Sequence, residues 1–165
     1  MRRAIYWLLS AAVLAALGYL LHEKESILRD GRLVFLKQAP VDSRSRRPGN
    51  SMPLRYEIEA AVGDDAGWYD STDGHLVLAL DERHIGRFVR IHAGEPLAPD
   101  EILLRYRRRR GGLRIGAESF LFQKGHAMRY ARSAYSELRV APSGQCILVG
   151  LRDADLAPLG AARSP

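Results

Sequence analysis

The stretch His75–His92, HLVLALDERHIGRFVRIH, decides the fold that the sequence predicts. Its two ends, His75–Asp81 and Gly86–His92, are rich in Leu, Val and Ile, and a short link of residues 82–85 separates them. Short apolar runs bounded by polar residues are typical of β-strands. We therefore expect two strands joined by a tight connection.

Similar strand signals recur on both sides of this stretch. Turn-forming residues such as Gly111-Gly112 and Pro142–Gln145 separate short apolar runs, and only Lys124–Ala134 has apolar residues spaced for one face of a helix. This pattern predicts a mainly β domain, a small antiparallel barrel or sandwich with one short helix over an open end. The further strands expected are Arg32–Leu36, Leu54–Glu59, Ile102–Tyr106, Leu113–Gly116, Leu138–Val140 and Cys146–Leu151.

The predicted core consists of apolar side chains that share one face of these strands. It comprises Leu33, Phe35, Leu54, Tyr56, Ile58, Leu76, Leu78, Leu80, Val89, Ile91, Phe120, Val140, Ile147 and Val149.

The N-terminal region is a separate feature. Residues 4–21, AIYWLLSAAVLAALGYLL, carry no charge, and as a helix they would extend about 27 Å, close to the thickness of a bilayer core. Arg2 and Arg3 precede the run, so the positive-inside rule predicts a cytoplasmic N-terminus. The sequence thus predicts a single-pass membrane protein with its C-terminal domain outside the cytoplasm. A cleaved signal peptide ending near Ala16-Leu17-Gly18 is the alternative.

These signals divide the chain into three parts. Residues 1–28 are expected to form the transmembrane anchor, with the helix ended by Gly31, and residues 29–154 the extracytoplasmic β-domain. Residues 155–165, rich in Ala and Pro, are expected to be a flexible tail.

Composition limits the chemistry that the domain can perform. Cys146 is the one cysteine, which excludes an internal disulfide and a zinc site built on several thiolates. The net charge is +6, yet basicity alone does not indicate nucleic-acid binding, and none is expected. We expect no cofactor and no metal.

Two constellations invite a catalytic or metal-binding interpretation. Asn50–Pro53 resembles the nucleophile segment of membrane-anchored signal peptidases, but the one lysine that follows it, Lys124, lies in a polar stretch rather than on a strand. His75, His84 and His92 have no compact ligand spacing. A serine at a loop-to-strand junction and solvated histidines at strand ends are the favoured interpretations.

The densest charge cluster contains five arginines near one predicted hairpin tip. Because alternate residues of a strand face opposite sides, both faces of this tip would be basic. A solvated tip is the favoured interpretation, and contact with anionic lipid is the alternative. The five are Arg105, Arg107, Arg108, Arg109 and Arg110.

Two segments resemble the GDYXXLXY family of membrane-anchored bacterial proteins. The turn Pro40–Arg44 and the segment Gly49–Tyr56, GNSMPLRY, follow the family's order, keeping Gly49, Leu54 and Tyr56 but replacing Asp by Asn50 and Tyr by Ser51. The segment Ile115–Phe122, IGAESFLF, resembles the family's second conserved segment. The resemblance implies an anchored β-domain without known activity, held at a bacterial inner membrane with the domain in the periplasm. Members of the family often accompany polytopic membrane proteins or are fused to them.

The residues that carry this resemblance are also candidates for structural or interaction roles. Leu54 and Tyr56 alternate onto one face, so both are expected in the core, with the Tyr56 hydroxyl at a polar edge. Glu118, if buried, needs a partner, for which Arg44 and Arg47 are candidates. The full set is Asp42, Arg44, Arg47, Gly49, Leu54, Tyr56, Gly116, Glu118 and Phe120.

The function expected from these features is that of an accessory or interaction module for a membrane partner, more plausibly than an enzyme. The partners expected are the bilayer, through residues 4–21, and a polytopic membrane protein. One alternative is a hydrolase that uses Ser51 or Glu118. The other is a domain that binds a ligand of the cell envelope, for which a deep apolar pocket near Glu118 would be the evidence.

Overall fold

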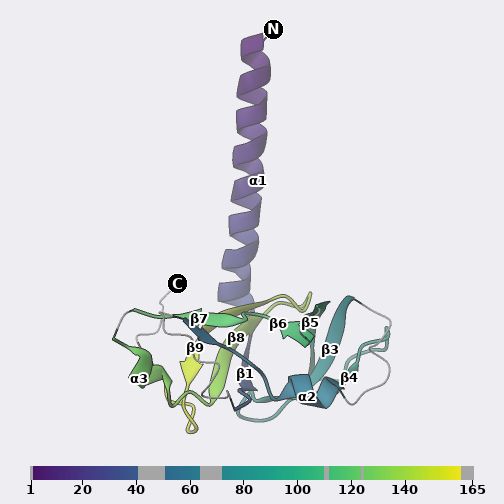
Figure 1. Ribbon diagram of the computed structural model, residues 1–165. Coiled ribbons are helices and arrows are strands. Elements are labelled where there is room, and N and C mark those ends of the chain that lie inside the picture. Colours follow the sequence, from purple (N-terminus) through teal and green to yellow (C-terminus); the bar gives the residue numbers. More distant parts are fainter. Residues whose placement is uncertain (1, 41–50, 64–71, 110–111, 124, 161–165) are drawn as a thin grey trace.

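The computed structural model describes residues 2–40, 51–63, 72–109, 112–123 and 125–160. Over these residues the chain is mainly β, with three antiparallel sheets and three helices. A long helix projects from a compact body, and the sheets share one core within that body (Figure 1). The prediction of a mainly β, antiparallel domain is confirmed, whereas the single barrel or sandwich with one short helix is wrong.

Helix α1 (Arg2–Asp30) continues past the charge-free run, as expected, and ends before Gly31. The Gly31 amide donates a hydrogen bond of 3.0 Å to the Ile27 carbonyl, which closes the last turn. A Cβ at residue 31 would collide with that carbonyl oxygen, so this helix end requires glycine.

The prediction that α1 is a transmembrane anchor is wrong. Among the described residues no helix is both long enough and apolar enough to span a bilayer. Freedom from charge is a weaker criterion than apolarity, because more than half of residues 4–21 are Ala, Gly, Ser, Tyr or Trp. These residues favour insertion less than Leu, Ile and Val do. The same finding makes the predicted localisation wrong, that of a single-pass inner-membrane protein with a periplasmic domain.

One three-stranded sheet lies at the foot of α1. It has the order β1 (Arg32–Lys37), β8 (Tyr135–Val140), β9 (Cys146–Arg152), with antiparallel pairs throughout. Every second residue of β8 is buried, as expected for a strand with one face on the core. The predicted closing hairpin is confirmed.

The four-stranded sheet contains the stretch from which the fold was predicted. Its order is β4 (Gly86–Ile91), β3 (Asp73–Leu80), β5 (Glu101–Arg109), β6 (Gly112–Ile115), and it lies at the opposite side of the body from β9 (Figure 1). Asp81 shapes the link between β3 and β4, because its Oδ1 accepts hydrogen bonds from the amides of Arg83 and Ile85 at 2.9 and 2.8 Å.

The predicted strand Leu54–Glu59 is wrong. The chain instead forms β2 (Ser51–Pro53), which pairs with β7 (Ser119–Leu121), and then helix α2 (Ile58–Gly63). The Glu59 carboxylate accepts a hydrogen bond of 3.0 Å from the Tyr56 amide, one half of a capping box that favours the helix start. This local bond outweighs the alternation of apolar and charged residues.

The predicted helix Lys124–Ala134 is reduced to a single turn, α3 (Ala127–Tyr130). Its Tyr130 is buried, but Met128 is 84% exposed, so the turn does not bury the face that the spacing indicated.

Eight of the fourteen predicted core residues are buried, and Ile91 and Phe120 pack half-buried against them. Leu33, Ile147 and Val149 are half-buried outside this cluster, and Val89 is exposed. The C-terminal segment also joins the core, since Leu159 is buried and its amide bonds the Leu151 carbonyl at 2.9 Å. The described part of the predicted flexible tail, residues 155–160, is therefore packed against β9. The buried hydrophobic residues of the main cluster are Val34, Leu36, Leu54, Tyr56, Ile58, Val62, Leu76, Leu78, Leu80, Ile102, Leu104, Tyr106, Leu113, Ile115, Tyr130, Leu138, Val140, Leu151 and Leu159.

Candidate functional site

The two segments that carried the family resemblance lie against each other. Met52 of β2 pairs with Phe120 of β7, and the Leu54 amide donates a hydrogen bond of 2.9 Å to the Glu118 carbonyl. Segments more than sixty residues apart in the sequence therefore form one structural unit. Leu54 and Tyr56 are both buried in the core, as predicted.

Tyr56 ends a buried chain of hydrogen bonds. The Ser133 hydroxyl donates to the side-chain oxygen Oε1 of Gln38 at 2.9 Å, and the side-chain nitrogen Nε2 of Gln38 donates to the Ser136 hydroxyl at 3.0 Å. Ser136 in turn hydrogen-bonds to the Tyr56 phenol, which donates to the Ala117 carbonyl at 3.1 Å. Burial raises the pKa of the Tyr56 phenol, so the hydroxyl remains a donor. The chain of bonds joins β1, β8 and the Gly116–Glu118 turn.

Gly116 allows that turn to approach β9. Its φ is +57°, and a Cβ would lie 2.9 Å from the Cys146 sulfur. Cys146 is packed in this confined site, where burial raises the pKa of its thiol to about 11. By its exposed area Cys146 is half-buried.

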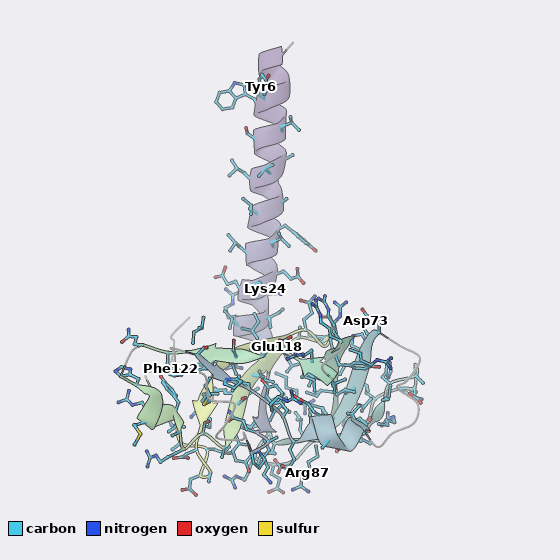
Figure 2. The ribbon with its side chains drawn as sticks, in the orientation of Figure 1. Tyr6, Lys24, Asp73, Arg87, Glu118 and Phe122 are labelled. Carbon is cyan, nitrogen blue, oxygen red and sulfur yellow. The ribbon has the colours of Figure 1, made fainter. Side chains whose placement is uncertain are left out.

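Glu118 is not buried, whereas its predicted pairing with Arg44 or Arg47 assumed that it is. Its side chain is 53% exposed and forms an ion pair of 3.0 Å with Arg114. Figure 2 shows it on the side of the body from which α1 projects. The candidate partners Arg44 and Arg47, together with Asp42 and Gly49, lie outside the described residues, so their roles stay predictions.

A hollow of about 480 Å³ lies beside this unit, between β7, α3, β9 and residues 158–160. Phe120 and Phe122 line it and contact Tyr130, with ring centroids 4.9 and 5.5 Å apart. Apolar side chains of β9 and the C-terminal segment complete the wall, among them Val149, Leu151 and Leu159. The volume falls in the range of small-molecule sites.

The charged residues of this hollow are of two kinds. Arg152 and Glu137 neutralise each other, because the Arg152 Nε donates to the Glu137 carboxylate at 2.7 Å. The same guanidinium donates to the Leu156 carbonyl at 3.2 Å and lies over the Phe35 ring. Arg129 and His126 are exposed on the lining, and the described residues offer Arg129 no ion pair. The rim is therefore cationic.

Sequence reasoning missed this hollow apart from Phe120. Phe120 and Phe122 alternate along the chain and so share a face, which was the available signal. The contributions of Tyr130, Glu137 and Arg152 depend on long-range packing that no local pattern encodes.

A comparison with protein families finds a model described as GDYXXLXY protein, which matches residues 13–151. The chain belongs to the GDYXXLXY family. No curated protein and no solved structure was found to match it at a significant level. The predicted family is thereby confirmed. The motif segment lies within the matched residues, whereas the hollow extends beyond them to Arg152 and residues 158–160.

The other catalytic candidates of this GDYXXLXY protein find little geometric support. Ser51 is exposed on β2, and no lysine or histidine in the described part of the chain hydrogen-bonds to it; Lys124 lies outside that part. Of the predicted metal-ligand candidates, His75 contacts the Ser143 carbonyl at 3.1 Å, and His84 lies in the β3–β4 turn. Over the residues searched, no group of three or more His, Cys, Asp and Glu could hold a metal ion.

The arginine hairpin of β5 and β6 has two kinds of arginine. Arg105 forms an ion pair of 3.4 Å with Asp73, whereas Arg107 and Arg109 are exposed. Asp73 lies on the side of the body that carries α1 (Figure 2), and Arg107 pairs with it in the sheet. Arg108 is half-buried, and Arg110 lies outside the described residues. Contact of this hairpin with anionic lipid stays a prediction.

Helix α1 presents the largest exposed apolar surface of the family member. Its far part stands clear of the body, with Tyr6 near its end (Figure 2). Nine large apolar side chains of α1 are between 52% and 78% exposed: Tyr6, Trp7, Leu9, Val13, Leu14, Leu17, Tyr19, Leu20 and Leu21.

The foot of α1, by contrast, is fixed to the body. Ile27 is 4% exposed, Gln145 bonds to both Glu23 and Lys24, and Arg139 donates to the Gly31 carbonyl at 3.1 Å.

Proposed function

We propose that this protein is an interaction module whose helix α1 binds among the apolar helices of a partner protein. The observation that carries the proposal is the exposure of nine large apolar side chains on α1. An exposed, contiguous apolar surface of this extent marks an interaction site. The partner is of the kind that the family resemblance implied, a protein with several apolar helices.

The distribution of these side chains favours a partner that surrounds the helix. Trp7, Leu14 and Leu21 follow one another at intervals of seven residues on one side, while Leu9, Ala12, Ala16 and Tyr19 occupy the opposite side. Ser10 is the one serine or threonine among residues 4–21. A helix that is apolar all round is stable when it is covered all round. Pairing with one further helix would cover one side.

The energetic scale supports the same arrangement. Complete burial of a Leu, Val or aromatic side chain contributes roughly 1.5–3 kcal/mol. Association costs an estimated 4–15 kcal/mol in lost freedom. Burial of all nine side chains contributes roughly 14–27 kcal/mol, near or above the top of this range, whereas burial of two or three contributes roughly 3–9 kcal/mol, in its lower half.

Photo-crosslinking in cells that express the full chain tests the proposal. A photoreactive residue is placed at Ala12 or at Leu14, which are about 200° apart around the helix. Both positions are exposed. The matched control is Arg87, which is exposed on the side of the body away from α1 (Figure 2).

We expect both helix positions to crosslink to the same protein, at peptides from its apolar helices, and the Arg87 position to give no such product. Crosslinks only to a second copy of the chain, crosslinks from one helix position only, or equal products from Arg87 would contradict the proposal.

A further inference from the structure

We propose that the hollow between β7, α3, β9 and residues 158–160 binds an amphipathic organic anion, a carboxylate with an apolar body. The proposal is independent of the role of α1. The body of the ligand would occupy the apolar and aromatic wall, and its carboxylate would lie at the rim.

The wall of the hollow supplies the apolar half of the site. Phe120, Phe122 and Tyr130 form a contacting aromatic cluster, and Tyr130 is itself buried. Val149 adds an aliphatic side chain from β9 and is half-buried. An alkyl or aryl group placed here would be removed from water on several sides, at roughly 25 cal/mol for each Å² of apolar area.

The rim decides the charge of the ligand. Glu137 is the acidic residue of the lining, and Arg152 already neutralises it at 2.7 Å. Arg129 remains as a guanidinium without an ion pair in the described residues, and the His126 imidazole lies beside it on the lining. A guanidinium binds a carboxylate through two parallel hydrogen bonds, so the charge complement is an anion.

The position of Arg152 keeps the site open for such a ligand. Its guanidinium is held by Glu137, the Leu156 carbonyl and the Phe35 ring. Arg152 therefore shapes the hollow and leaves the recognition of the carboxylate to Arg129.

Titration calorimetry with three probes tests the proposal on the full chain. Decanoate carries both halves of the proposed ligand, decanol carries the apolar body alone, and acetate carries the carboxylate alone. The variants are Arg129→Gln at the rim and Val149→Trp to fill the hollow. Arg87→Gln repeats the loss of charge on the side of the body away from α1, and Leu14→Gln reduces the apolar surface of α1.

We expect decanoate to bind at one site, at least tenfold more tightly than decanol or acetate. Arg129→Gln should weaken decanoate binding about tenfold, and Val149→Trp should remove it while the circular dichroism spectrum of the folded chain is retained. Arg87→Gln and Leu14→Gln should leave it unchanged.

Several results would overturn the proposal. These are equal binding of decanoate and decanol, equal losses in Arg129→Gln and Arg87→Gln, and loss of binding in Leu14→Gln, which would place the probe on α1. Phe122→Ala provides a second test of the wall should Val149→Trp fail to fold, and unchanged decanoate affinity in Phe122→Ala would count against the site.

Discussion

Tyr56 combines two roles in one side chain. Its ring is buried in the core, and its hydroxyl connects Ser136 to the Ala117 carbonyl. Phenylalanine would fill the same space, but the Ala117 carbonyl would lose the hydroxyl that donates to it, and Ser136 would keep only its bond from Gln38. A buried polar group without a hydrogen bond costs about 1–3 kcal/mol. This explains in physical terms why a tyrosine closes the motif segment.

We predict that Tyr56→Phe lowers the free energy of unfolding by about 1–3 kcal/mol, because Ser136 and Ala117 each lose a partner. Urea unfolding monitored by circular dichroism measures this change. The matched control is Tyr19→Phe on the exposed part of α1, which should change stability by less than about 0.5 kcal/mol. Equal effects of the two substitutions would mean that the buried chain of hydrogen bonds does not stabilise the fold.

Among the elements, the base of α1 is fixed at its junction with the β8–β9 hairpin by several kinds of contact. Ile27 is buried, the Gly31 amide closes the helix, and the Gln145 side chain holds the last turns in place. The nine large exposed side chains between Tyr6 and Leu21 contribute nothing comparable to the stability of the body.

We predict that Ile27→Ala lowers the free energy of unfolding of the body by about 2–4 kcal/mol, because it leaves a cavity at this junction. Leu17→Ala, at an exposed position of the same helix, should change it by less than about 0.5 kcal/mol. Thermal unfolding of the two variants, followed by β-sheet circular dichroism, provides the comparison. Similar losses would show that the far part of α1 also stabilises the body.

The elements differ in how far the sequence could predict them. The strands β3, β4, β5 and β6 follow from apolar runs and turn residues, because each run pairs with its neighbour along the chain. β2 and β7 could not be predicted in this way, since each has three residues and exists through pairing with a distant segment. The start of helix α2 depends on one hydrogen bond, which the Tyr56 amide donates to the Glu59 carboxylate and which competes with a strand-like pattern.

The candidate site shows the same division. The placement of Leu54 and Tyr56 followed from alternation and is confirmed. The exposure of Glu118 could not be predicted from alternation, because its surroundings depend on the β2–β7 pairing and on Arg114. A charge-free run likewise indicated a membrane span that α1 does not provide.

For the whole molecule, stability should fall in alkaline solution through two acidic groups, the half-buried Cys146 thiol and the buried Tyr56 phenol. Burial raises the pKa of the Cys146 thiol to about 11, whereas an unfolded chain has a cysteine pKa near 8.5. Above that lower value the unfolded chain releases its proton while the folded protein retains it. The stabilisation is thus complete below about pH 8.5 and is lost as the pH rises toward 11. Tyr56 acts in the same direction at higher pH.

We predict that the free energy of unfolding decreases by about 2 kcal/mol between pH 8 and pH 10.5 owing to Cys146. Cys146→Ala should remove this part of the pH dependence, although the variant itself is less stable near neutral pH. Urea unfolding at both pH values, for both proteins, gives the difference. Parallel pH profiles for the two proteins would contradict the prediction.

The rigid junction at residues 23–31 has a mechanical consequence. Because Ile27, Gln145 and Arg139 hold the base of α1 from several sides, the helix and the body move together as a lever. From Ile27 to Tyr6 the arm measures about 30 Å, so a tilt of about 10° at its base displaces Tyr6 by roughly 5 Å. A partner bound to the far end of α1 would therefore set the orientation of the hollow and of the arginine hairpin. A small change of angle at one end becomes a large change of position at the other.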